Sequence, residues 1–143
     1  MSSRPTRAQT LIEGNKKSEF YSDFLTSFSK TPVGNQLAKV VNERSINQSL
    51  KNIILTDVGE RLFQPNFGSN VRALLFENNV EENLSTLEYY ISNSIALNEP
   101  RVNLIELNLS TGETEHELVV NIIYNTINNP EPVLFTYIFK RVR

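Results

Sequence analysis

Two carboxylates are the first candidates for chemistry in this chain of 143 residues. Glu60 lies beside an aromatic loop, and Glu77 or Glu99 could supply a second carboxyl group. Glycoside cleavage needs such a pair, with the carboxyl groups about 5–10 Å apart on either side of a sugar. However, Arg61 and Arg101 stand close to two of these acids in the sequence, and pairing with arginine would lower the pKa of a carboxyl group. The pattern therefore favours structural ion pairs over a general acid.

The other reactive side chains form no catalytic or metal-binding pattern. His116 is the sole histidine and lies between two glutamates after a predicted turn, as an ordinary surface residue would. Glu113, Glu115 and Glu117 alternate along a predicted strand, but no second ligand cluster accompanies them. The sequence contains no phosphate-binding glycine motif, no nucleophile elbow and no cysteine. We therefore expect no catalytic residue, no metal site and no cofactor.

The composition is typical of one soluble globular domain, with 39% hydrophobic and 21% charged residues. No apolar run approaches the roughly 18 residues that span a bilayer, and no signal peptide is apparent. We therefore expect no membrane partner and a location in the host cytoplasm during assembly.

Charge is distributed unevenly, although the formal net charge is only −2. Residues 77–99 contain five acids and no base, whereas Lys140, Arg141 and Arg143 make the C-terminal end basic. Opposite poles favour association with other proteins over binding to nucleic acid, and solvated surface charge is an equal alternative.

The segment Thr56–Phe76 is the most informative part of the chain, because two helical patterns flank an aromatic loop. A solvated connector has no need of both Phe63 and Phe67, so we expect the loop to pack onto another surface. Adjacent charges in the loop also suggest an ion pair. We assign a structural role to six loop residues: Gly59, Glu60, Arg61, Pro65, Phe67 and Gly68.

The N-terminal part of the chain divides at about residue 20. Residues 1–19 are polar and predict a flexible or partner-ordered arm, which leaves residues 20–143 as a single domain. Phe20, Phe24 and Phe28 alternate with polar residues and predict a short strand or extended segment.

Helical spacing of apolar residues predicts two main helices. The first spans Glu43–Leu55, with Asn42 as its N-cap. The second spans about Val80–Leu97 and is ended by Pro100. A short helix is predicted directly after Asn70.

The remainder predicts a meander of three strands, Val102–Ser110, Glu115–Asn125 and Val133–Val142. The middle strand is apolar on both faces, so one face should meet the helices and the other something outside the monomer. The fold class is therefore α+β, with helices packed on a three-stranded antiparallel meander at the C-terminus. One face of the last strand carries Val133, Phe135, Tyr137 and Phe139.

Several short pieces occur in a fixed order and together resemble a known family. The pieces are Ile54-Leu55-Thr56, Gly59-Glu60-Arg61, Pro65 with Phe67-Gly68, Leu74-Leu75-Phe76 and Glu99-Pro100-Arg101. This order, over about residues 35–142, resembles the small baseplate-wedge proteins of contractile phage tails and type VI secretion systems.

The resemblance implies a structural component of a virion tail baseplate. It implies that Glu99, Pro100 and Arg101 dock against a helical bundle of larger baseplate-wedge proteins. The C-terminal strands, including the face of the last strand that carries Val133, Phe135, Tyr137 and Phe139, would template the first ring of the tail sheath protein by strand exchange. The tail tube is a further candidate partner. The alternatives for these two elements are an internal ion pair that only ends a helix and an ordinary protected strand edge.

Two other functions remain open, a peptidoglycan hydrolase and a generic adaptor domain. Members of the family have been described as lysozyme-like. Burial distinguishes the possibilities, because a hydrolase must open Glu60 or Glu99 to a cleft, whereas a structural protein should pair them with arginine.

Overall fold

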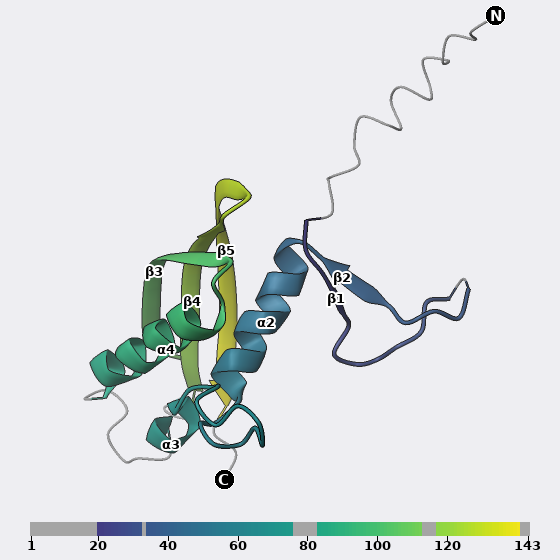
Figure 1. The fold of residues 1–143 in the computed structure, drawn as a ribbon. Coiled ribbons are helices and arrows are strands. Elements are labelled where there is room, and N and C mark those ends of the chain that lie inside the picture. The colour runs from purple at the N-terminus through teal and green to yellow at the C-terminus, as the bar shows by residue number, and fades with distance from the viewer. Residues whose placement is uncertain (1–19, 33, 76–82, 113–116, 141–143) are drawn as a thin grey trace, which may run out of the picture.

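The computed structural model describes residues 20–32, 34–75, 83–112 and 117–140. It consists of a body, in which helices pack on a three-stranded sheet, and a hairpin that extends from the start of the first helix of the body (Figure 1). The predicted α+β class is confirmed. The predicted N-terminal arm, residues 1–19, lies outside the described residues.

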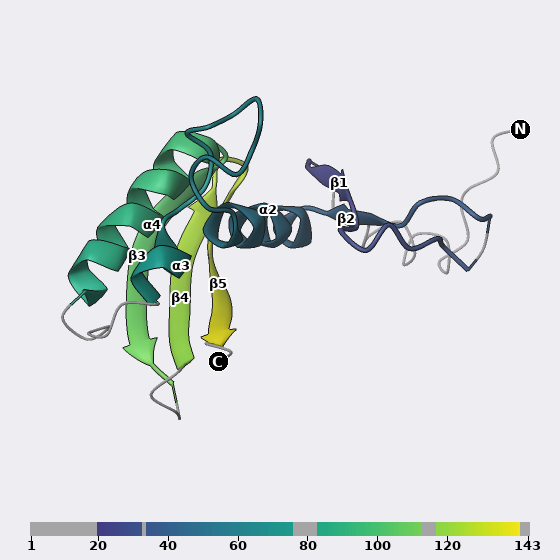
Figure 2. The same ribbon diagram turned by 90° about the horizontal axis from the view of Figure 1, so that it is seen from below.

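Helix α2 spans Glu43–Leu55, which are the predicted boundaries. Its buried apolar residues recur at helical spacing: Ile46, Leu50, Ile53 and Ile54. Burying each such side chain stabilises the fold by roughly 1.5–3 kcal/mol relative to its exposure. Three residues of this stripe, Ile46, Leu50 and Ile54, belong to the main hydrophobic core, and Figure 2 shows α2 beside the last strand of the sheet, β5 (Asn129–Lys140).

Asn42 precedes α2 as predicted, but its side chain does not cap the helix. Its backbone is left-handed in φ, at 51°. Its Oδ1 instead accepts hydrogen bonds from the backbone N–H groups of Phe20 at 2.9 Å and Tyr21 at 3.4 Å. The side chain therefore fastens the preceding hairpin to the start of α2.

The hairpin pairs β1 (Ser22–Phe24) with β2 (Lys39–Val41) in antiparallel register. The predicted extended segment over Phe20–Phe28 is correct only in part, because the backbone bends directly after β1. Gln48 of α2 holds this bend, since its Nε2 donates to the carbonyl oxygen of Phe24 at 2.8 Å. All three phenylalanines of the segment are exposed: Phe20, Phe24 and Phe28.

Two further helices complete the helical layer. Helix α3 (Val71–Leu75) confirms the short helix predicted after Asn70. Helix α4 spans Leu84–Asn98, while the predicted start at Val80 lies outside the described residues. Its buried residues are Leu87, Ile91, Ser94 and Ile95.

The sheet has the order β3-β4-β5, with antiparallel pairing throughout. Its strands are β3 (Val102–Thr111), β4 (Glu117–Thr126) and β5 (Asn129–Lys140). Strand β5 begins at Asn129 and not at Val133 as predicted, although its first part contains two prolines. An edge strand tolerates proline because it has an unpaired side, where a missing N–H breaks no ladder bond.

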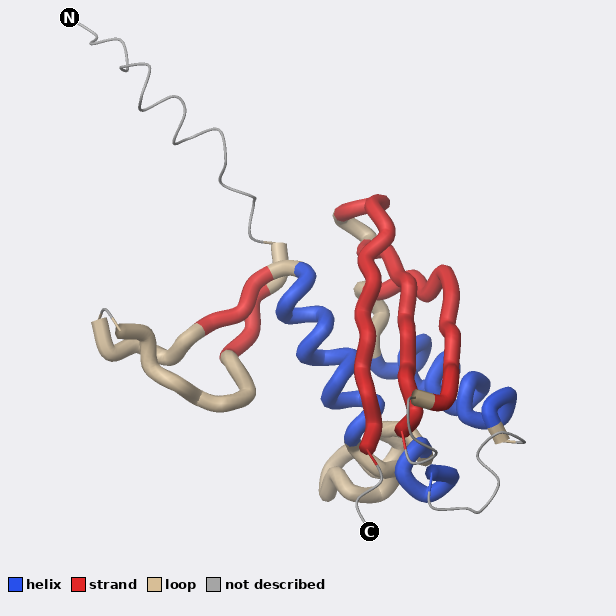
Figure 3. Tube along the Cα trace, turned by 180° about the vertical axis from the view of Figure 1, so that it is seen from behind, coloured by secondary structure: helices blue, strands red, loops and turns tan. Residues whose placement is uncertain are grey.

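The helices cover one face of the sheet (Figures 2 and 3). On that face β4 contributes fully buried residues to the core: Leu118, Val120, Ile122 and Tyr124. The hydroxyl of Tyr124 donates to Oδ1 of Asn47 on α2 at 2.6 Å. Burial, with nearby carboxylates, raises the pKa of Tyr124 to about 12. The hydroxyl is thus a neutral tie between sheet and helix at ordinary pH.

Candidate partner-binding surfaces

The segment Glu99-Pro100-Arg101, called the elbow below, joins α4 to β3. The guanidinium of Arg101 donates from Nε to Oε1 of Glu99 and from Nη2 to Oε2, both at 2.6 Å. Ser49 on α2 donates its hydroxyl to Oε2 of Glu99 at 2.5 Å. In the free protein Arg101 therefore uses two of its donors within the chain, as the alternative of an internal ion pair requires.

Glu99 is buried but ionised. Its side chain is only 3% exposed, whereas that of Arg101 is 36% exposed. Burial alone would raise the pKa of Glu99, but the hydrogen bonds from Arg101 and Ser49 and the guanidinium charge outweigh it, so the pKa lies below its usual value. A carboxyl group in this state is poorly suited to act as a general acid.

The elbow also connects the hairpin to the end of the sheet. The guanidinium of Arg101 lies 5.3 Å from the ring centroid of Tyr21. The hydroxyl of Tyr21 accepts a hydrogen bond from Nδ2 of Asn128 at 2.8 Å. The backbone N–H of Ile127 donates to the carbonyl oxygen of Arg101 at 3.3 Å. These contacts could not be predicted from the sequence, because their partners are far apart in the chain.

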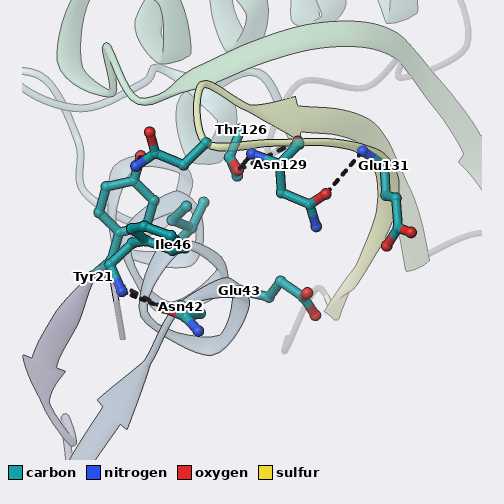
Figure 4. Close-up of a pocket in the computed structure, with 9 residues that line it drawn as sticks. Tyr21, Asn42, Glu43, Ile46, Thr126, Asn129 and Glu131 are labelled. Atoms are coloured by element: carbon teal, nitrogen blue, oxygen red, sulfur yellow. Dashed lines mark hydrogen bonds between the residues drawn. The ribbon is translucent and has the colours of Figure 1, made fainter. Parts of the chain in front are cut away.

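A pocket of about 210 Å³ lies beside this junction, between the hairpin base, α2 and the β4–β5 turn (Figure 4). Ile46 and Tyr21 form apolar wall, while Glu43 and Glu131 bring carboxylates. The remaining lining residues are Phe20, Asn42, Thr126, Asn128 and Asn129. The pocket has one acid from α2 and one from the start of β5, and Glu99 is not among its lining residues.

The loop between α2 and α3 differs from its prediction in the pairing of its charged side chains. The expected Glu60–Arg61 ion pair is wrong: Oε2 of Glu60 accepts from the backbone N–H of Asp57 at 3.1 Å. Arg61 donates from Nη1 to Oε1 of Gln64 at 2.9 Å, and its guanidinium lies 3.9 Å from the ring centroid of Phe67. Glu60 is therefore engaged three residues back in the chain and Arg61 three residues ahead, and neither pairs with its immediate neighbour.

Among the residues that the structure describes, no surface of the free chain covers Phe63, so packing of this side chain onto another surface stays a prediction about a partner. Phe63 is 95% exposed and Leu62 is 91% exposed, whereas Phe67 is half-buried. Two of the loop residues that we assigned a structural role, Gly59 and Pro65, do hold the backbone. The N–H of Gly59 donates to the carbonyl oxygen of Pro65 at 2.8 Å.

Gly68 anchors the other end of this loop against α2 and α4. Its φ is 114°, and a Cβ there would lie 2.3 Å from the carbonyl oxygen of Thr56. Its own carbonyl oxygen accepts a hydrogen bond from the hydroxyl of Ser94. Only glycine fits this close approach of two backbones.

The apolar face proposed on the last strand faces the helices of its own domain. Phe139 is buried, and three residues are partly buried against the core: Val133, Phe135 and Tyr137. The side chains that point away from the helices include Leu134 and Ile138, which are exposed. Contact of a sheath partner with Val133, Phe135, Tyr137 and Phe139 therefore stays a prediction. In the free protein the accessible face of β5 is the one that carries Leu134 and Ile138.

The remaining candidates for chemistry are dispersed. Glu60 is exposed at the loop, and Glu77 and His116 lie outside the described residues. Glu117 pairs with Lys140 at 3.1 Å. Within the described ranges, no cluster of three or more His, Cys, Asp or Glu could hold a metal ion. None of the described helices is long and apolar enough to cross a membrane.

The chain is similar to proteins of a known family. A model of the family described as baseplate wedge protein gp25 matches residues 40–131. The baseplate wedge protein gp25 of Enterobacteria phage T4 is 34% identical over 90 residues, which are 63% of this chain and 68% of that protein.

Solved structures share the fold. A candidate tail lysozyme from Geobacter sulfurreducens aligns with a TM-score of 0.64 at 26% identity, over 71% of this chain and 92% of that chain. A chain of the anti-feeding prophage baseplate aligns with a TM-score of 0.59 at 18% identity, over 84% of this chain and 85% of that chain, which supports the fold alone. From the family match and the phage T4 relative, we conclude that this chain belongs to the gp25 family of baseplate wedge proteins.

Proposed function

We propose that this protein is a structural component of a contractile-tail baseplate. In this proposal it docks onto a helical bundle of larger wedge proteins through the elbow and templates the first sheath ring through its C-terminal strands. Family membership is the observation that carries the structural role. The proposal includes assembly of the particle in the host cytoplasm and leaves the tail tube as a further candidate neighbour.

The geometry of the elbow supports a docking role. Pro100 is exposed at the junction of α4 and β3, and Glu99 holds Arg101 in a fixed orientation. Arg101 presents part of its guanidinium to solvent. A side chain that is already ordered loses little conformational entropy when it binds. A carboxylate or carbonyl of the partner would add to the existing pair without displacing it.

The sheet supports a templating role. Strands β3 and β5 are both edges of the sheet, and an edge strand can accept a strand from another chain through main-chain hydrogen bonds. The face away from the helices carries the exposed residues Leu134 and Ile138. An added strand would extend this face and bring its own side chains beside these two residues.

We further propose that the protein is not a hydrolase. Glu99 is held ionised by Arg101 and Ser49, and Glu60 stabilises a turn by accepting the N–H of Asp57. The T4 relative is named as a wedge protein, whereas the Geobacter neighbour is named for a lysozyme. Sequence identity and the state of Glu99 favour the structural role.

The docking role is tested by Arg101→Ala, with the protein co-expressed with the larger wedge proteins of the same particle. We expect the variant to fold but to be lost from the purified wedge complex. Arg44→Ala is a matched control, because Arg44 is an exposed arginine on α2. Co-purification of the Arg101→Ala variant at the wild-type level would contradict docking through the elbow.

A further inference from the structure

The loop from Thr56 to Ser69, called the braced loop below, is held by hydrogen bonds along its length. Five of its backbone N–H groups donate to carbonyl oxygens of the same segment at 2.8–3.3 Å: Gly59, Glu60, Gln64, Phe67 and Ser69. The N–H of Asp57 is engaged by the Glu60 carboxylate. Such a loop presents its side chains in one arrangement before any partner arrives.

The braced loop directs large apolar side chains into solvent. Leu62 and Phe63 are more than nine-tenths exposed, and Leu97 at the end of α4 is 70% exposed. Phe63 and Leu97 line the same groove, of about 650 Å³, between the loop and the last turn of α4. The other lining residues are Arg61, Gln64, Pro65, Asn66, Phe67 and Asn98. Clustered, ordered aromatic and aliphatic side chains are typical of binding hot spots.

The charge of the groove indicates what it would accept. Arg61 is the single charged residue among its lining residues. The guanidinium of Arg61 stacks on Phe67 and donates to the neutral side chain of Gln64, and no acid within the described residues forms an ion pair with it. A carboxylate on the occupant would complete this site.

The mode of binding follows from the backbone. Addition of a strand needs a row of free main-chain donors and acceptors. The N–H groups that are already bonded within the braced loop are spaced along it and interrupt such a row. The groove instead offers side chains from two walls, which is how an amphipathic helix binds. Asn98 of the groove directly precedes Glu99, so an occupant here could also reach the elbow.

We propose that the groove between the braced loop and the end of α4 binds an amphipathic helix of a larger wedge protein. The helix would place apolar residues three or four positions apart against Phe63 and Leu97 and a carboxylate against Arg61. The inference rests on the proposed function for the identity of the partner. The chemistry of the site comes from the groove itself.

The first experiment places a photo-crosslinking phenylalanine analogue at position 63 in protein co-expressed with the larger wedge proteins. We expect a crosslink to a helical segment that carries an acid within one turn of the crosslinked residue. A crosslink to the sheath protein, to a second copy of this chain or to an extended segment would overturn the inference.

The second experiment measures binding of purified variants to the same wedge proteins. We expect Phe63→Ser and Arg61→Glu each to weaken binding at least about tenfold, with unchanged melting of the free protein. Leu134→Ser is the control, because Leu134 is 63% exposed but lies on the sheet face away from the helices. Replacing the crosslinked acid by arginine should restore binding of the Arg61→Glu variant.

The two proposals fail separately in this assay. Loss of binding by Arg101→Ala, together with wild-type binding by Phe63→Ser and Arg61→Glu, would overturn the groove and leave docking through the elbow intact. Wild-type binding by all three variants would overturn both. Failure of charge reversal to restore binding would overturn the pairing of Arg61 with that acid.

Discussion

At the scale of single residues, Glu99 explains why the elbow has a fixed shape. It receives two bonds from Arg101 and one from Ser49, so three donors from two elements converge on one carboxylate. A buried carboxylate that is fully hydrogen-bonded resists protonation and holds its partners in register. The same contacts link this residue to the stability of the whole domain.

We predict that Glu99→Gln destabilises the domain by about 1–3 kcal/mol at pH 7, because it removes charge-assisted hydrogen bonds from a buried group. The folded-state pKa of Glu99 is lowered, so its contribution is complete above the unfolded pKa, about 4.3, and is lost as the pH falls through the folded value. Urea unfolding at pH 7 and at lower pH measures this. The exposed Glu88→Gln should leave stability unchanged; equal pH profiles for wild type and Glu99→Gln would contradict the prediction.

We predict that Gly68→Ala destabilises the domain by about 2 kcal/mol or more, because the methyl group collides with the carbonyl of Thr56 and φ is positive. Gly59→Ala is the matched control, since φ is 90° there but no atom lies within 4 Å of the added Cβ. Its cost should be smaller, about 1 kcal/mol. Thermal melting of the two variants compares them, and equal losses would show that the contact with Thr56 has no effect.

We predict that the purified protein does not lyse cell walls above background and that Glu60→Gln changes nothing in that assay. Glu60 is engaged in a turn, and Glu99 is ionised and buried. Turbidity of a peptidoglycan suspension measures lysis, with an established lysozyme as the positive control. Reproducible clearing that the Glu60→Gln variant loses would favour the hydrolase.

At the scale of elements, spacing predicted most of what the structure contains. The apolar stripe from Ile46 to Ile54 predicted α2 correctly, because a helix that buries one apolar face shows this spacing in its sequence. Strand β2 was missed, because Lys39–Val41 is too short to show an alternating pattern. Phe63 is exposed in the free chain, and its apolar character alone does not say whether the surface that covers it lies within the chain or in a complex.

The role of the last strand, β5, can be tested by shortening its C-terminal end. Deleting residues 140–143 removes the Lys140–Glu117 ion pair and the end of the β5 edge, but leaves the buried Phe139 in place. We expect a domain that still melts cooperatively, in baseplates that assemble but start sheath polymerisation poorly. Electron microscopy of the particles measures sheath length and frequency. Sheaths of normal length at normal frequency would show that this strand end is not the template.

At the scale of the whole molecule, the core lies between the helices and one face of the sheet, and the candidate binding surfaces lie around it. The sequence predicted the core and the family resemblance, which is confirmed. It indicated the pair between Glu99 and Arg101, but it could not predict the other hydrogen-bond partners of the acids, because Glu99 also accepts from Ser49 on a distant helix and Glu60 accepts from a backbone N–H. Such choices depend on the folded arrangement and not on nearness in the chain.

The β1–β2 hairpin leads to the final prediction. It projects from the body (Figure 1), and a two-stranded hairpin alone is marginally stable in water. It is connected to the body through Asn42, Gln48 and Tyr21. The side chains of Asn42 and Gln48 form hydrogen bonds with its backbone, and Tyr21 packs at the edge of the core. The family model matches residues 40–131, so the hairpin lies almost wholly outside the shared region.

We predict that protein lacking residues 1–41 still melts cooperatively, with a midpoint lower by roughly 5–10 °C because the packing of Tyr21 and its bond from Asn128 are lost. Protein lacking only residues 1–19 is the control and should melt within about 2 °C of the full chain. Tyr21→Phe, which removes the hydroxyl and keeps the ring, should reproduce a small part of the loss. If the larger deletion abolishes cooperative melting, the hairpin belongs to the folding unit, and residues 20–143 act as one inseparable domain.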